Sequence, residues 1–179
     1  KSGERHETTH YCVADRFGNV VAVTTTLNGL YGCKLVVGGA GFLLNNEMDD
    51  FAAKPGVPNM FGLIGGEANA IAPNKRMLSS MTPTIVLKDG KPFLALGGRG
   101  GSRITTAVAT IILNVIDFGM NVQDAVEMPR IHHQWLPDKI LYESHSLSYD
   151  TMENLVRMGY ALEHTSAHNA RVQAIMFDQ

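Results

Sequence analysis

Cysteine and net charge are both scarce in this sequence of 179 residues. The two cysteines, Cys12 and Cys33, are too few to form a disulfide framework in a chain of this length. Lys and Arg together number 15 and Asp and Glu 17, so the formal net charge is −2. Such a balance gives no electrostatic basis for binding nucleic acid or a membrane surface. No apolar run reaches the roughly 18 to 20 residues that a membrane-spanning helix needs.

The composition that remains is that of a globular domain. Hydrophobic residues make up 45% of the chain and charged residues 18%, and this length is enough for one domain with a sizeable core. The expected strands and helices fall in separate blocks along the chain. This segregation predicts an α+β fold, in which helices pack outside the sheets.

Two β-rich runs, TTHYCVAD and VVAVTTT, predict an antiparallel hairpin near the start of the chain. The letters RFGN between them suit a three-residue loop with Gly18 in the left-handed conformation. If Asp15 pairs with Asn19, Thr8 and Thr26 are equally far from the turn and lie directly opposite each other, with Cβ atoms about 4.5–5.5 Å apart. Both faces of this hairpin are fairly apolar, so we expect both to be covered.

Beyond this hairpin, the sequence alternates between irregular stretches and clear strand patterns. Residues 41–44 are expected to form a short buried strand that leads into an acidic loop. Residues 54–74 are expected to form a long irregular excursion, a type of loop that is often functional. The run TIVLKDGKPFLAL predicts a second hairpin that turns at Asp89 and Gly90, and VQAIMF predicts a last strand.

Three helices are predicted in the second half of the chain. Apolar residues at three- and four-residue spacing predict a helix that begins after Ser102 and ends before Gly119. Asn121 is expected to cap a short helix that stops at Pro129, and residues 150–158 predict a third helix.

The letters HETTH, from His6 to His10, match the zinc motif HExxH. That motif binds metal only on a helix, where its two histidines share one face. Here the intervening residues favour a strand, in which four residues span roughly 13 Å, too far for one metal ion. We therefore predict no metal site.

Four groups of residues could carry chemistry. Thr8 and Thr26 could be a nucleophile and its neighbour, although cross-strand threonine pairs also simply stabilise sheets. The glycine loop GGRGGS lies before a helix, where backbone N–H groups can stabilise an oxyanion. The remaining groups are a carboxylate cluster, which could hold an ammonium group, and a hydroxyl pair, which could hold a carboxylate but more often caps its own backbone. They consist of Glu47, Asp49 and Asp50, and of Ser79 and Ser80.

The segments TTHYCVAD, TTTLN, LLNNEMDDF, KPGVPN, NKRMLSSMTPTIV, GGSRI and PRIHHQWLP resemble, in spelling and order, the small subunit of bacterial γ-glutamyltranspeptidases. The resemblance implies an N-terminal-nucleophile hydrolase with an αββα sandwich, of which this chain is the small-subunit half. It also implies a precursor that cuts itself just before the nucleophile, a γ-glutamyl small molecule such as glutathione as substrate, no cofactor, and a periplasmic or secreted location.

Carried over by position, the resemblance assigns Thr8 as the nucleophile of both self-cleavage and catalysis, with Thr26 as its hydrogen-bonding partner. Gly100 and Gly101 resemble the oxyanion-hole pair. The other matched positions hold the α-amino group of the donor (Asn28, Glu47 and Asp50) or its α-carboxylate (Ser79 and Ser80).

The sequence departs from the family pattern in three places. Arg99 and Met77 stand where many members have proline, and the family's final hairpin is absent after Gln179. The large subunit, which supplies an arginine for the donor carboxylate, is a further expected partner. We therefore expect residues 1–7 to be the end of the large-subunit or linker segment, and residues 8–179 to be the small-subunit catalytic domain, truncated at its C-terminus.

Two other interpretations stay open on the sequence alone. The chain could be an inactive fragment or pseudoenzyme that keeps the fold, or it could belong to a related acylase. Ser79, Ser80 and Asp50 favour the glutamyl reaction, because together they suit the free amino-acid end of a glutamyl group.

The chain with residues 1–7 still attached is expected to have no transpeptidase activity. The Thr8 nitrogen is then a peptide amide, whose delocalised lone pair cannot act as a base. An uncleavable form, assayed against a γ-glutamyl anilide with the large subunit supplied, should show no turnover. Turnover at the rate of the cleaved protein, with the Glu7–Thr8 bond intact, would contradict a mechanism based on the α-amine.

Overall fold

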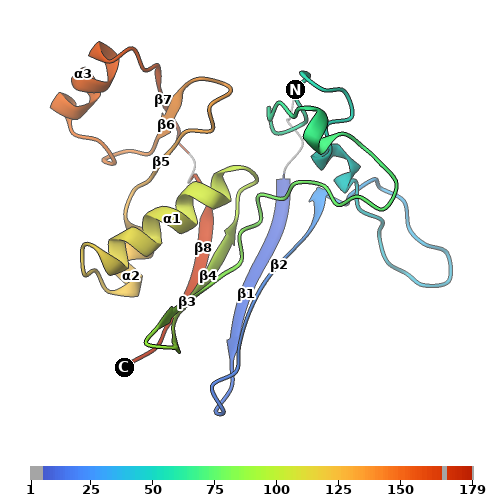
Figure 1. The fold of residues 1–179 in the computed structure, drawn as a ribbon, viewed down its shortest axis with the longest axis horizontal. Helices are drawn as coiled ribbons and strands as arrows, with labels where there is room; N and C mark the ends of the chain where they lie inside the picture. Colours follow the sequence, from blue (N-terminus) through green and yellow to red (C-terminus); the bar gives the residue numbers. More distant parts are fainter. Residues whose placement is uncertain (1–5, 167–168, 179) are drawn as a thin grey trace.

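The computed structural model describes residues 6–166 and 169–178, which form an α+β arrangement of small sheets and helices (Figure 1). Most of residues 1–7 therefore lie outside the described part of the chain. The strands are β1 (His6–Ala14), β2 (Val20–Gly29), β3 (Thr84–Lys88), β4 (Lys91–Arg99), β5 (Ile131–His132), β6 (Ile140–Tyr142), β7 (Leu162–His164) and β8 (Arg171–Met176). The α-helices are α1 (Arg103–Ile116), α2 (Val122–Glu127) and α3 (Tyr149–Arg157), and two 3-10 turns are η1 (Glu47–Asp50) and η2 (Glu67–Asn69).

The hairpin of β1 and β2 has the predicted register. Thr8 lies directly opposite Thr26 in the antiparallel ladder. The turn closes where the Asp15 N–H donates to the Asn19 carbonyl at 3.0 Å, and Gly18 has the expected positive φ of 86°. The HETTH letters lie in strand β1, whereas the zinc motif that they match requires a helix.

A second antiparallel sheet, in the order β3-β4-β8, lies between this hairpin and the helices. Side chains along β4 alternate between its two faces. Leu94 and Leu96 pack into a buried cluster with residues of α1, whereas Gly97 faces the ring of His10 on β1. The result is a helix layer, a sheet and a second sheet, which is three layers of the expected αββα sandwich.

The helices confirm the periodicity of the sequence. The buried residues of α1 are Ile104, Ala107, Val108, Ile111, Asn114 and Val115. The Asn121 side chain caps α2 by accepting a hydrogen bond from the Asp124 N–H at 2.9 Å. Helix α3 covers Tyr149–Arg157, so each of its ends lies one residue earlier than predicted.

One expectation about an apolar segment is wrong, and a second is not met within the described residues. Residues 41–44 form no strand; Leu43 makes only an isolated bridge with Val36, and Phe42 is 56% exposed. Among the described residues the hairpin is covered on its inner face, and Tyr11 and Val13 on its outer face are 48% and 53% exposed, so the cover expected for the outer face stays a prediction. Both stretches are apolar in sequence, but within the described residues no sheet or helix packs against them.

The small sheet of β5, β6 and β7 was not predicted. Its strands are two or three residues long, too short to produce an alternating pattern. No helix among the described residues is long and apolar enough to cross a membrane.

Replacement of Gly97 is expected to loosen the contact between the two sheets. A Cβ atom at this position would lie 2.3 Å from Cε1 of His10, so Gly97→Ala should reduce the free energy of unfolding by about 1–3 kcal/mol. Gly38→Ala is the matched control, because its Cβ would meet nothing within 4 Å. Denaturant unfolding measures both, and equal midpoints for the two variants would argue against this packing.

Candidate active site

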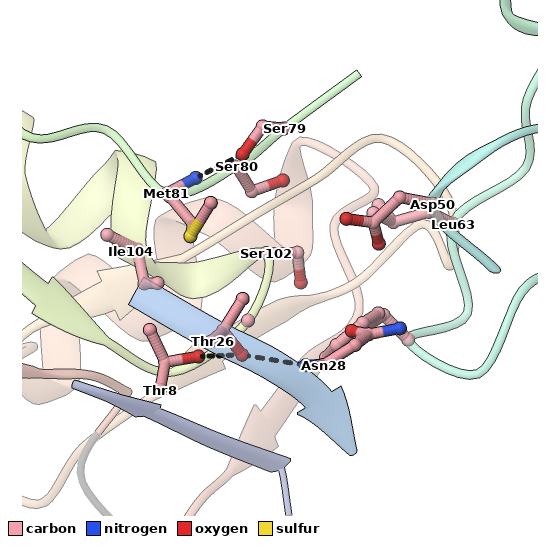
Figure 2. Close-up of a pocket in the computed structure, with 12 residues that line it drawn as sticks. Thr8, Thr26, Asn28, Asp50, Leu63, Ser79, Ser80, Met81, Ser102 and Ile104 are labelled. Carbon is pink, nitrogen blue, oxygen red and sulfur yellow. Dashed lines mark hydrogen bonds between the residues drawn. The ribbon is translucent and has the colours of Figure 1, made fainter. Parts of the chain in front are cut away.

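One pocket gathers most of the predicted site residues (Figure 2). All of them except Gly100 and Glu47 line it, and they come from four separate segments. These are the hairpin strands (Thr8, Thr26 and Asn28), the 3-10 turn η1 (Asp50), the segment before β3 (Ser79 and Ser80) and the loop before α1 (Gly101).

The two threonines are joined by a hydrogen bond. The Thr8 hydroxyl donates to Oγ1 of Thr26 at 3.2 Å, and the backbone N–H of Asn28 donates to the same oxygen at 2.8 Å. Figure 2 shows both contacts as one line along the floor of the pocket. The backbone N–H of Asn28 therefore holds the Thr26 hydroxyl in place. The Thr26 hydroxyl in turn positions the Thr8 hydroxyl.

Asn28 is buried and has a positive φ of 71°. Its side-chain Nδ2 donates to the Asn46 carbonyl at 3.3 Å and contacts Sδ of Met60 at 3.4 Å. Since the amide nitrogen is used by the protein, the amide oxygen Oδ1 is the end that can accept a hydrogen bond from a ligand.

The carboxylates of η1 have different surroundings. Asp50 lines the pocket, and burial, together with the nearby charges of Glu47 and Asp49, raises its pKa to about 6. Burial also raises the pKa of Glu47. Asp49 is engaged by the protein, because its Oδ2 accepts the Met60 N–H at 3.1 Å. Of the three carboxylates, Asp50 is thus the one that lines the pocket, and the charge of Glu47 contributes to its raised pKa.

The two serines lie on the opposite side of the pocket from Thr8 in Figure 2. The Ser79 hydroxyl oxygen accepts the Met81 N–H at 3.3 Å, which is the backbone-capping role that serine pairs often have. The Met81 carbonyl in turn accepts the Thr24 hydroxyl at 3.4 Å. This contact connects the serine segment to the same hairpin that carries the two threonines.

The loop before α1 needs glycine at two consecutive positions. Gly100 and Gly101 have φ values of 148° and 61°. A Cβ atom on Gly101 would lie 2.7 Å from Cδ1 of Phe61, and one on Gly100 would lie 3.0 Å from Ala170. Side chains are excluded from this loop both by its conformation and by its neighbours. Arg99, one of the three departures from the family pattern, is the last residue of β4 and lies opposite Arg171 of β8.

Sequence patterns did not indicate several lining residues. Phe61 and Leu63 come from the irregular excursion, which has no periodicity to place its side chains. Ser102 also lines the pocket, and its hydroxyl donates to Oε1 of Gln134 at 2.7 Å. The position of Ser102, directly after the glycine pair, was the one signal that could have identified it.

No group of three or more His, Cys, Asp and Glu side chains in residues 6–166 and 169–178 could hold a metal ion. His10, the second histidine of the HETTH letters, follows Thr8 by two residues. Its side chain is buried and contacts other protein groups. Its Nδ1 lies 2.7 Å from Oγ1 of Thr24 and its Nε2 3.2 Å from Sγ of Cys12. Burial lowers the pKa of His10 and raises that of Cys12, so both favour their neutral forms.

Comparison with known proteins gives consistent matches. The sequence profile of the gamma-glutamyltranspeptidase family matches residues 1–179. A glutathione hydrolase proenzyme of Escherichia coli is 57% identical over 156 residues, which are 87% of this chain and 27% of that protein. A glutathione hydrolase proenzyme of Pseudomonas aeruginosa is 50% identical over 177 residues, or 98% of this chain and 32% of the relative. The chain thus spans about a third or less of the length of these relatives.

The fold agrees with the sequence matches. A crystal structure of a mutant gamma-glutamyltranspeptidase from Helicobacter pylori is similar with a TM-score of 0.88 and 55% identity, covering 94% of this chain and 90% of that one. Together, the profile match over the whole chain and this similarity in structure show that the chain belongs to the gamma-glutamyltranspeptidase family.

Proposed function

We propose that this chain is the catalytic part of a self-cleaving γ-glutamyltransferase and glutathione hydrolase, with Thr8 as its nucleophile. The observation that carries the proposal is the hydrogen bond from Thr8 to Thr26 in a pocket that also contains Asp50 and Ser80. A hydroxyl nucleophile therefore shares one pocket with a carboxylate suited to an ammonium group and a hydroxyl suited to a carboxylate.

The reaction begins with release of the Thr8 α-amine. Thr8 Oγ1 attacks the Glu7 carbonyl carbon, the Glu7–Thr8 C–N bond breaks, and the departing nitrogen takes up the hydroxyl proton, which leaves Glu7 as an ester on Oγ1. Water then hydrolyses this ester, which gives a Glu7 carboxylate and restores the Thr8 hydroxyl at a new N-terminus. The free amine then takes the proton of Oγ1 as this oxygen attacks the γ-carbonyl carbon of the donor. N–H groups of the Gly100 and Gly101 loop stabilise the tetrahedral oxyanion.

The intermediate collapses when the leaving amine accepts the proton and departs, and the glutamyl group stays on Thr8 as an ester. Water or an amino acid then attacks the ester carbonyl, and Oγ1 leaves as a hydroxyl after recovering a proton through the α-amine. Phe61 and Leu63 line the same pocket and give the glutamyl chain an apolar surface to pack against.

The donor is oriented by its amino-acid end. Its ammonium group lies between Oδ1 of Asn28 and the carboxylate of Asp50, while its carboxylate meets the hydroxyls of Ser79 and Ser80. Glu47 supports this arrangement through its charge. A large subunit cut from the same precursor, with residues 1–7 at its end, supplies the rest of the site, and the assembled protein works in the periplasm or outside the cell.

Thr8→Ala is expected to block cleavage of the Glu7–Thr8 bond, because the attacking hydroxyl is lost. Mass spectrometry of the full precursor measures the outcome. The unchanged precursor should yield a fragment that begins at Thr8, and the variant should stay intact. Thr9→Ala, which removes the neighbouring hydroxyl of the same strand, is the matched control and should still be cut. A Thr8→Ala precursor that splits at this bond would remove Thr8 from the mechanism.

Asp50→Asn is expected to reduce kcat/KM for a γ-glutamyl anilide far more than it slows self-cleavage. Asp50 must be charged to attract the ammonium group, and below its pKa of about 6 the carboxyl is neutral. Wild-type kcat/KM should therefore be high above pH 6 and fall as the pH decreases through 6. In the variant, kcat/KM should stay low and should not change as the pH passes through 6.

Asp49→Asn is the matched control for this prediction. It removes a carboxylate from the same turn and keeps an oxygen for the Met60 N–H. Since the charge of Asp49 raises the pKa of Asp50, the decrease in kcat/KM should shift to lower pH. An Asp50→Asn enzyme that keeps the wild-type pH profile would show that another group binds the ammonium.

A further inference from the structure

Two charged side chains are buried in a part of the chain to which the proposed function assigns no role. Arg130 directly precedes β5 and Glu143 directly follows β6, and they are 5% and 7% exposed. Arginine and glutamate are almost never buried unless hydrogen bonds or an opposite charge compensate for the loss of water. The contacts that these two side chains make therefore show what they hold in place.

These contacts converge on Asn169 and Ala170, the two residues that directly precede β8. The Glu143 carboxylate accepts the backbone N–H of Asn169 with Oε1, and that of Arg130 with Oε2 at 3.0 Å. The Arg130 guanidinium donates from Nη2 to the Ala170 carbonyl at 2.8 Å. The Asn169 side chain donates to the Arg130 carbonyl at 3.0 Å. Both residues of segment 169–170 are thus tied to the buried charges by hydrogen bonds.

Segment 169–170 packs directly against the glycine loop before α1. A Cβ atom on Gly100 would lie 3.0 Å from Cα of Ala170 and 3.0 Å from the carbonyl oxygen of Asn169. The next residue of the loop, Gly101, lines the Thr8 pocket. A displacement of segment 169–170 would therefore move the loop from which the oxyanion donors come.

The glycine loop has a second attachment, to the first turn of α1. The Gly100 carbonyl accepts the Arg103 N–H at 3.3 Å, and the Gly101 carbonyl accepts the Ile104 N–H at 3.2 Å. These bonds use the carbonyl groups of the loop and join it to the helix, whereas the contact with segment 169–170 joins it to β8. Oxyanion donors act only when they point at the place where negative charge develops, and a misplacement of about 1 Å can cost roughly 100-fold in rate.

From these contacts we infer that Glu143 is a positioning residue for the oxyanion loop. Its hydrogen bond to Asn169, together with that of Arg130 to Ala170, keeps segment 169–170 against Gly100 while the tetrahedral intermediate forms. Both charged side chains lie outside the lining of the Thr8 pocket, so they act through the segment and not on the substrate. The inference rests on the proposed function, in which N–H groups of this loop stabilise the oxyanion.

The test compares two ligands of the two-subunit enzyme, with the subunits co-expressed separately so that no variant depends on self-cleavage. The first is the analogue of glutamate in which a boronic acid replaces the γ-carboxyl group. Thr8 Oγ1 bonds to the boron as its proton passes to the α-amine, which gives a tetrahedral boronate anion that resembles the intermediate. The second is norvaline, which has the same amino-acid end but a methyl group in place of the boronic acid. Isothermal titration calorimetry gives both Kd values.

The wild type should bind the boronate at least roughly 100-fold more tightly than norvaline. In Glu143→Gln, one of the two backbone N–H groups faces an amide NH2 group instead of an oxygen. The segment should then shift, and the ratio of the two Kd values should fall roughly 10- to 100-fold while the Kd of norvaline stays unchanged. Glu153→Gln, which alters an exposed carboxylate on α3, is the matched control and should keep the wild-type ratio.

A folded Glu143→Gln enzyme with the wild-type ratio would overturn the inference and leave the proposed function in place. An equal loss of both affinities would indicate a general distortion of the pocket and would overturn it too. Asn169→Ala removes the hydrogen bond to the Arg130 carbonyl and should lower the ratio in the same direction, so it decides the question if Glu143→Gln does not fold. A wild type that binds the boronate no more tightly than norvaline would instead contradict the proposed oxyanion loop itself.

Discussion

The register of the β1–β2 hairpin is the constraint on which the rest of the site depends. Side chains alternate along a strand, so a slip of one residue would turn Thr26 to the other face of the sheet and away from Thr8. The turn prevents this slip. Gly18 takes the left-handed conformation, and Oδ1 of Asp15 accepts the N–H groups of Phe17 and Asn19 at 2.8 and 3.0 Å. A local turn thus determines a contact at the far end of both strands.

The second sheet holds this hairpin in place, and it can do so because of one small residue. Gly97 leaves room for the ring of His10, which lies on the same face of β1 as Thr8. The Thr24 hydroxyl, opposite His10, contacts both that ring and the carbonyl of Met81. Packing between the sheets and the position of the serine segment are therefore connected through a single pair of residues on the hairpin.

Local patterns were enough to predict the longer strands and the helices. The two hairpins have turn residues that suit only those turns, and α1 has a clear apolar stripe. These features are decided within a few residues of the chain, so they can be read without knowing the fold. The resemblance to a family then selected a small set of residues, and all of these except Gly100 and Glu47 line the pocket.

The sequence could not predict what depends on distant contacts. Residues 41–44 have the composition of a strand, but their pairing with residues 33–37 amounts to one isolated bridge, between Leu43 and Val36, and a few backbone hydrogen bonds. The strands of the small sheet are too short to show a period, although they contain the buried residues Ile140 and His132. Phe61 reaches the pocket only because the excursion folds back over Gly101.

Two properties of the described residues suggest that a second polypeptide packs against this chain. The first is an uncovered surface, since the outer face of the hairpin exposes Tyr11, Val13 and Val21 at about half of their area. Apolar strand faces are normally buried, and the αββα arrangement buries this one under a further layer. We infer that this layer comes from outside the described residues.

The second property is the charge of the Thr8 pocket. A glutamyl donor carries both an ammonium and a carboxylate at its amino-acid end, and the pocket offers Asp50 to the first. For the second it offers serine hydroxyls, and no Lys or Arg is found among the described residues that line it. A hydroxyl alone stabilises a buried carboxylate less than a paired cation does. Arg103 does not fill this role, because it lines a second cavity and not the Thr8 pocket. The missing cation and the missing layer can come from one polypeptide, so we infer that the donor site is completed by the same partner that covers the hairpin.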